Sequence, residues 1–142
     1  MFKVFSLFLF VAMSFKTQAC SCDLGSPEDK LATFDSVFLG KLIEIKNKGT
    51  TNAFNEPEIE VTFEQIRRFK GTDKDVVLDT NFNRASCTGY WFKEGQTMLV
   101  YASLNDGKLD VMWCGGVIVK EENPEQLQNE LIALEEVLRN AS

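Results

Sequence analysis

Two cysteines stand close together near the start of the chain, where backbone and side chains together could do chemistry. They belong to Cys20-Ser21-Cys22, which follows a segment with the features of a secretory leader: a lysine near its start, an apolar run over residues 4–15, and the small residue Ala19 at its end. Cleavage after Ala19 would make Cys20 the first residue of the mature chain. We therefore expect one point at which a free backbone amine, a carbonyl and an anchored side chain lie together.

Two alternatives exist for segment 1–19. It could be retained as a membrane anchor, or it could be a lipoprotein signal, in which case lipidation of Cys20 would block the amine. Its apolar run, residues 4–15, is shorter than the roughly 20 residues that a membrane-spanning helix needs. A lipoprotein signal also requires cysteine at the first mature position, but Thr17 and Gln18 fit poorly with the apolar and small residues expected before it. We therefore expect a signal peptide over 1–19, a secreted product (periplasmic or extracellular), and a single domain over 20–142.

The residue types that are missing and the net charge exclude several classes of function. The chain has no histidine, which removes the commonest general base and zinc ligand, and with them His-assisted serine or cysteine hydrolase chemistry. The net charge is −6, and the two lysines of the leader make the remainder more acidic still. We therefore expect no nucleic acid partner and no membrane binding after signal cleavage. We also expect no enzymatic activity, no cofactor and no metal of its own.

Four cysteines are present, and all of them lie in the part expected to be exported: Cys20, Cys22, Cys87 and Cys114. An even number in an oxidising compartment predicts two disulfides. A bond between Cys20 and Cys22 would close a strained ring, so each is expected to reach one of the two distant cysteines, and two pairings remain open. Either pairing closes loops of roughly 65 to 95 residues, worth about 4 kcal/mol each in the chain-entropy model. A zinc site is not expected, because neither distant cysteine has a near cysteine neighbour.

The apolar pattern predicts five strands that must position these cysteines. Gly40 interrupts the first strand and indicates a bulge or bend, and Asn105-Asp106-Gly107 is a hairpin signal. Five strands without an internal repeat predict a mainly β protein, a small antiparallel closed barrel of the OB type. The expected strands are 37–46, 59–69, 76–82, 97–102 and 109–113, with a loop over 47–57.

Two helices are expected to flank the barrel. Ser26-Pro27-Glu28 predicts a short N-terminal helix with Ser26 as its cap, and Asn123-Pro124-Glu125 opens a C-terminal helix in the same way. Leucines spaced by four, three and four residues give the second helix one apolar stripe, which we expect to pack on the core. Several aromatic residues could form a stacking platform but are expected to be core or half-buried strand residues: Phe82, Tyr90, Trp91, Phe92 and Trp113.

In this order, the motifs resemble the N-terminal, netrin-like (NTR) domain of the tissue inhibitors of metalloproteinases. The resemblance covers roughly residues 20–114. The matching pieces are Cys20-Ser21-Cys22, Val37-Phe38-Leu39-Gly40-Lys41, Phe69-Lys70-Gly71, Ser86-Cys87-Thr88-Gly89-Tyr90 with Phe92 and Gly95, Met98-Leu99-Val100-Tyr101-Ala102, Asn105-Asp106-Gly107-Lys108-Leu109, and Cys114.

The resemblance implies a covalent frame and a mechanism. It implies an OB-like barrel with the pairings Cys20–Cys87 and Cys22–Cys114. It also implies that the free amine and the carbonyl of Cys20 chelate the catalytic zinc of a target protease. An α-amine has a pKa near 8, so a useful fraction is neutral, and the chelate would take the position that a catalytic zinc leaves for water.

The resemblance further implies which residues touch the protease. Ser21 would point into the specificity pocket, and Ala85 and Ser86 would form a second contact ridge that the Cys20–Cys87 disulfide holds in place. Cys20, Cys22, Asp23 and Cys87 complete the expected contact set. The chain departs from the family in three respects: the third disulfide of this domain has no counterpart, a single helix is expected in place of a cysteine-rich second domain, and Asp23 replaces a small or apolar residue.

Together these features predict a secreted, monomeric, non-enzymatic inhibitor of zinc metalloproteinases. The alternative is a non-inhibitory netrin-like module that binds some other extracytoplasmic protein without touching zinc. A thiol-disulfide enzyme using Cys20 and Cys22 is a third class, but no thioredoxin-like βαβ pattern surrounds these residues.

Overall fold

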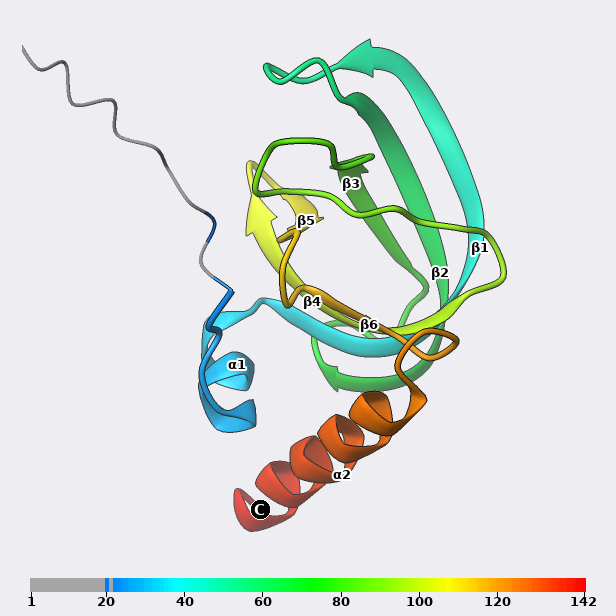
Figure 1. Cartoon of the computed structure of the whole chain (residues 1–142). Helices are drawn as coiled ribbons and strands as arrows, with labels where there is room; N and C mark the ends of the chain where they lie inside the picture. Colours follow the sequence, from blue (N-terminus) through cyan, green and yellow to red (C-terminus); the bar gives the residue numbers. More distant parts are fainter. Residues whose placement is uncertain (1–19, 21) are drawn as a thin grey trace, which may run out of the picture.

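The computed structural model describes residue 20 and residues 22–142. The expected signal peptide over 1–19 and the expected pocket residue Ser21 lie outside the described residues. Figure 1 shows a barrel of strands with one short helix and one long helix against its outer face. In chain order the elements are α1 (Pro27–Thr33), β1 (Ser36–Thr51), β2 (Pro57–Lys70), β3 (Val76–Asn81), β4 (Thr97–Asn105), β5 (Lys108–Val111), β6 (Val117–Val119) and α2 (Pro124–Asn140).

The predicted five-stranded barrel is confirmed. The strands follow the order β1-β2-β3-β5-β4, and β4 pairs again with β1, which closes the ring. The expectation of an entirely antiparallel barrel is wrong at one joint, because β3 and β5 are parallel where Leu78 faces Leu109. An odd number of strands in a closed ring cannot all alternate in direction, so one parallel pair is unavoidable.

Strand β1 bends at Gly40, as the sequence predicts. The β1–β2 register shifts between Leu39 and Gly40, as expected for a bulge. A Cβ atom on Gly40 would lie 3.0 Å from the Phe38 ring and 3.2 Å from Cβ of Phe63. Gly40 therefore allows β1 to pass close to two large core side chains as it curves around the barrel.

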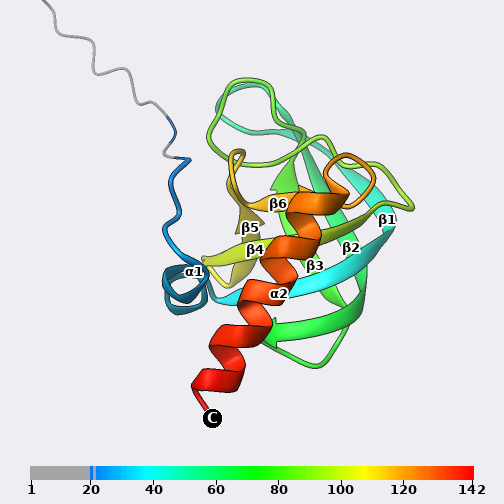
Figure 2. The same ribbon diagram turned by 60° about the horizontal axis from the view of Figure 1, so that its bottom comes forward.

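The barrel strands contribute side chains to two separate cores. The barrel interior is filled by buried residues such as Phe38, Leu42 and Phe63. A second core lies outside the barrel, where Tyr101 and Leu134 pack together with other residues of β1, β4, α1 and α2. Figure 2 shows α2 lying across the outer face of the barrel strands.

The two helices begin where the sequence predicts, but only one is capped by a side chain. The Asp29 N–H donates to Ser26 Oγ, while the Ser26 N–H and hydroxyl donate to the Asp29 carboxylate, so α1 starts with a capping box. Asn123 precedes α2, but its side chain makes no capping hydrogen bond. The apolar stripe packs on the core through Leu127 and Leu134, which are buried, and through the partly buried Leu131. Its last member, Leu138, is exposed, so the prediction is wrong at the end of the helix. No helix in the described part is long and apolar enough to cross a membrane.

Three further features of the barrel differ from the sequence expectations. Strand β1 extends to Thr51, so the first residues of the expected loop over 47–57 are strand and pair with β2. Strand β6, which pairs with β4 on the same edge as β5, was not predicted. The aromatic residues divide between core and surface: Phe92 is buried, but Trp91 is 51% exposed and stacks on Phe82. Trp113 is also exposed, beside Tyr90. The expectation of core or half-buried strand positions is therefore wrong for Trp91, and Trp113, at 38% exposure, lies outside the strands.

Candidate functional site

The disulfide pairing implied by the resemblance is confirmed. Cys20 is bonded to Cys87 with Cα atoms 5.3 Å apart, and Cys22 is bonded to Cys114 with Cα atoms 5.0 Å apart. No free cysteine remains, so the chain offers no thiolate to a metal ion. Among the described residues there is also no group of three or more Asp, Glu or Cys side chains placed to hold a metal.

The two partner cysteines, Cys87 and Cys114, lie on segments that are hydrogen-bonded to each other. Cys87 belongs to the long connection between β3 and β4, and Cys114 follows β5. The Trp113 N–H donates to the Cys87 carbonyl oxygen over 2.8 Å, and Thr88 forms an isolated bridge with Met112. Because these segments are bonded to each other, the two disulfides hold Cys20 and Cys22 against one continuous edge of the barrel.

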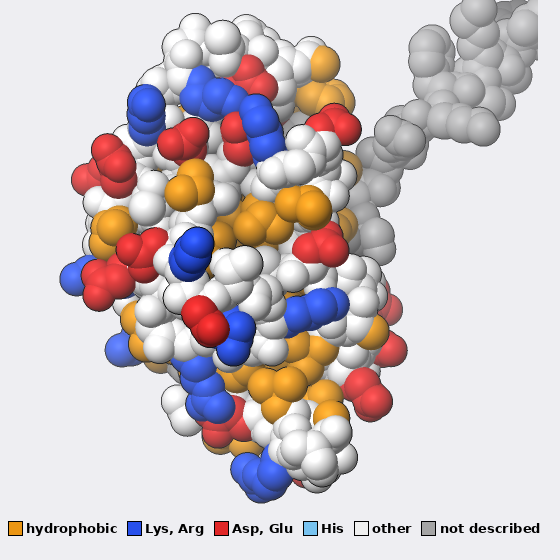
Figure 3. Space-filling model, turned by 180° about the vertical axis from the view of Figure 1, so that it is seen from behind, with side chains coloured by type: hydrophobic (Ala, Val, Ile, Leu, Met, Phe, Trp, Pro, Cys, Tyr) orange, Lys and Arg blue, Asp and Glu red, His pale blue; other side chains and the backbone are white. Residues whose placement is uncertain are grey.

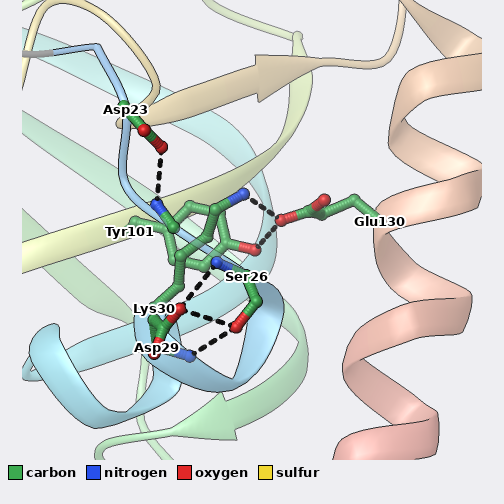
Figure 4. Close-up of polar contacts among 7 residues, drawn as sticks. Asp23, Ser26, Asp29, Lys30, Tyr101 and Glu130 are labelled. Carbon is green, nitrogen blue, oxygen red and sulfur yellow. Dashed lines mark hydrogen bonds and ion pairs between the residues drawn. The ribbon is translucent and has the colours of Figure 1, made fainter.

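The residues after Cys22 are held by short-range contacts (Figure 4). Asp23 is exposed, and its Oδ1 accepts the Gly25 N–H over 3.1 Å. Leu24 packs against Gly115, where an added Cβ would lie 2.8 Å from Leu24 Cδ1. The stretch then enters the capping box of α1, so the chain has little freedom between its second disulfide and its first helix.

A partly buried polar cluster ties α1 to α2 next to this segment. Glu130 of α2 accepts hydrogen bonds from Lys30 Nζ and from the Tyr101 hydroxyl, each over 2.5 Å. Lys30 Nζ also lies 5.1 Å from the centre of the Tyr101 ring, a cation–π contact. Burial, followed by the bond to Glu130, raises the pKa of Tyr101 far above its ordinary value, so this hydroxyl remains a donor.

The cluster predicts unequal effects of two substitutions. Glu130→Ala should lower the free energy of unfolding by about 3 kcal/mol, because it leaves a largely buried ammonium and a buried hydroxyl without their acceptor. Tyr101→Phe removes one donor and should cost about 1 kcal/mol. Urea unfolding of both variants measures the difference. Equal losses would show that Glu130 does not serve two donors.

The ridge expected from the resemblance consists of one outward and one inward residue. Ala85 is exposed, whereas Ser86 is only 6% exposed. Every polar atom of Ser86 is engaged inside the protein: its N–H and hydroxyl bond to Glu56, and its carbonyl oxygen accepts from Asn83 Nδ2. The surface of this ridge therefore comes from Ala85 and its neighbours, with Ser86 beneath them.

Glu56 is the residue of this region that sequence reasoning missed. Its side chain is fully buried. Oε1 accepts the consecutive backbone N–H groups of residues 84, 85 and 86 over 2.5, 2.7 and 3.0 Å. Oε2 accepts from the Ser86 hydroxyl over 2.5 Å and from the side-chain amides of Asn52 and Asn81 over 2.8 Å each.

The hydrogen bonds decide the charge state of Glu56. Burial alone would raise its pKa, but the bonds from Ser86, Ala85 and Asn52 outweigh burial and lower the pKa from 4.5 to about 2. Glu56 is therefore a buried carboxylate at any pH near neutral, and its charge is balanced by donors.

The lowered pKa predicts an acid-sensitive contribution to stability. Because the folded-state pKa lies below the unfolded-state value, the contribution is complete above about pH 5 and is lost as the pH falls towards 2. Its size is about 3 kcal/mol. Urea unfolding between pH 6 and pH 2.5 should show a larger loss of unfolding free energy in the native protein than in Glu56→Gln. Parallel pH profiles of the two proteins would contradict the assignment.

The geometry brings together most of the residues that the sequence singled out. Cys20, Cys22 and Cys87 meet at one edge with Cys114, Ala85 precedes Cys87, and Asp23 follows Cys22. Nothing in the sequence pattern marked Glu56, which lies in the stretch predicted as a loop. No family model matches this chain, and no curated protein matches it. The disulfide-bonded segments around Cys20 and the motifs quoted above are therefore the features that point to a function.

Proposed function

We propose that the chain is a secreted, monomeric inhibitor of zinc metalloproteinases, similar to the netrin-like domain of the tissue inhibitors, and is not an enzyme. After cleavage behind Ala19, the amine and carbonyl of Cys20 would chelate the zinc of the target. The observation that carries this proposal is the disulfide frame. Both cysteines at the start of the expected mature chain are bonded to adjoining segments of a closed barrel.

The chemistry needs only atoms that residue 20 supplies. A neutral amine nitrogen and the carbonyl oxygen of the same residue form a five-membered chelate with a metal. They would displace the water that a catalytic zinc binds at its open position, and so remove the nucleophile of the protease. Because the Cys20 side chain is already tied to Cys87, little conformational entropy remains to be lost on binding.

The edge around Cys20 offers further contacts to a protease cleft. Ala85 is exposed two residues before Cys87, and Asp23 is exposed beside Cys22. The role of Ser21 in the specificity pocket follows from the resemblance alone. Asp23 would place a negative charge beside the acidic base of a metalloproteinase, which would favour targets with a less acidic rim.

The surface charge supports a protein partner. On the face in Figure 3, acidic and basic side chains are interspersed, and no continuous basic surface is visible. That pattern, with the net charge of −6, disfavours a nucleic acid partner.

A non-inhibitory binding module remains the second candidate, because two tryptophans are exposed. Trp91 and Trp113 are 51% and 38% exposed, and exposed tryptophan is enriched where proteins bind each other. This second function would be favoured if the native protein inhibited no metalloproteinase and Trp91→Ala abolished its binding to another protein.

The test of the proposed function is an inhibition panel. The disulfide-bonded chain beginning at Cys20 is titrated against several zinc endopeptidases, with a serine endopeptidase as the matched control. We expect stoichiometric inhibition of at least one zinc enzyme and none of the serine enzyme. Full activity of all the zinc enzymes at micromolar inhibitor would contradict the proposal.

A further inference from the structure

A buried carboxylate that no cation neutralises needs an explanation. Within the described part of the chain, Glu56 takes part in no salt bridge. Taking a charge out of water is costly, and an apolar side chain of similar volume could fill the same space. What an apolar side chain could not do is collect several N–H groups at one point.

The donors that Glu56 collects come from a segment without regular structure. Residues 84–86 form no helix or strand, so their N–H groups have no ladder partners. Three consecutive N–H groups converge on a single oxygen atom of Glu56. Glu56 therefore replaces the hydrogen bonds that a regular element would supply, and it sets the direction of the backbone just before Cys87.

Glu56 is itself held by the end of the β1–β2 hairpin. The Asn52 side-chain oxygen accepts the N–H groups of Phe54 and Glu56 over 3.0 Å each. The Asn52 N–H donates to the Glu56 carbonyl oxygen over 3.0 Å, and Asn52 Nδ2 bonds the Glu56 carboxylate. Asn52 thus bonds the N–H, the carbonyl oxygen and the carboxylate of Glu56. The hairpin end therefore fixes the position of the carboxylate that residues 84–86 bind.

We propose that Glu56 is the positioning residue of the edge that carries Cys20. It holds residues 84–86 in the conformation that presents Ala85 beside the Cys20–Cys87 disulfide. The end of the β1–β2 hairpin thereby determines the shape of the second contact ridge, formed by Ala85 and Ser86. The assignment to protease contact rests on the proposed function, whereas the positioning of residues 84–86 does not.

Glu56→Gln tests the positioning, with Glu58→Gln as the matched control. Glu58 is two residues away and accepts one hydroxyl, that of Thr50, over 2.6 Å. In Glu56→Gln, amide hydrogen exchange at residues 84–86 should accelerate at least tenfold, while exchange at Phe38 and Val100 in the barrel stays unchanged. Unchanged exchange at residues 84–86, or equal acceleration throughout the barrel, would overturn the positioning role.

Binding kinetics test the link to inhibition. The dissociation rate of the complex between Glu56→Gln and an inhibited metalloproteinase should rise about tenfold, with the association rate unchanged and Glu58→Gln like the native protein. Accelerated exchange at residues 84–86 with native dissociation would overturn their role in contact. If the native protein inhibits no metalloproteinase, the proposed function fails, while the exchange result still decides the positioning.

A milder variant covers the case in which Glu56→Gln does not fold. Ser86→Ala removes the hydroxyl donor to Oε2 and leaves the carboxylate and the backbone donors in place. We expect about threefold faster exchange confined to residues 84–86. Native exchange rates in this variant would count against the assignment.

Discussion

Adding one alanine before Cys20 is expected to abolish inhibition of every metalloproteinase that the native protein inhibits. The extension turns the primary amine of Cys20 into an amide nitrogen, which has no lone pair for zinc, and moves the new amine away from the Cys20 carbonyl. We expect the inhibition constant to rise on the order of 100-fold or more, which is about 3 kcal/mol. The free energy of unfolding should stay unchanged, because both disulfides remain.

The matched control is one alanine added after Ser142, at the far end of α2. This form carries the same extra residue and should inhibit like the native protein. Inhibition constants for both extended forms, measured against the same enzyme, settle the comparison. Equal potency of the two forms would rule out chelation by residue 20.

The second large effect is expected from the double variant Cys20→Ser, Cys87→Ser. It keeps an amine and a carbonyl at residue 20 but removes the bond that holds them beside Ala85. The disulfide spans 67 residues, so its loss should lower the free energy of unfolding by about 4 kcal/mol. Inhibition should fall at least tenfold at temperatures where the variant is folded, because ordering residue 20 now costs entropy on binding.

The other disulfide provides the comparison for this variant. Cys22→Ser, Cys114→Ser opens a bond that spans 92 residues, so the loss of stability should be similar. It leaves Cys20 attached to Cys87, and inhibition should fall less. Chemical denaturation and inhibition constants of both double variants are measured together. Equal loss of inhibition would show that stability, and not the anchoring of Cys20, controls binding.

The parts of the fold that the sequence predicts are those whose signals are local. The hairpin between β4 and β5 turns through Asp106 and Gly107, with φ of 50° and 76°, conformations that Asp tolerates and glycine adopts freely. The capping box of α1 likewise needs only Ser26 and Asp29. The apolar stripe of α2 follows from its helical spacing.

The parts that the sequence could not predict depend on contacts between distant segments. Strand β6 is three residues long and pairs with residues 98–100 of β4, on an edge that β5 occupies only at residues 102–105. The parallel contact between β3 and β5 follows from closure of the ring. Trp91 lies on the surface because Phe92 beside it takes the core position, a choice that aromatic composition does not reveal.

The candidate site also contains residues that the sequence reveals and one that it does not. The cysteines and residues 85–87 were recognisable because their order along the chain resembles a family motif. Glu56 was not, since a single glutamate in a loop looks like any solvated carboxylate. Its role depends on donors 28 to 30 residues away in the chain. Such convergence becomes visible only in three dimensions.

The most direct measurement of the central claim uses a metalloproteinase in which cobalt(II) replaces the catalytic zinc. Cobalt in such a site has visible absorption bands that respond to its ligands. Binding of the chain beginning at Cys20 should change these bands as a nitrogen and an oxygen replace water, whereas the alanine-extended chain should leave them unaltered. Inhibition by the native chain with an unchanged cobalt spectrum would contradict zinc chelation by Cys20.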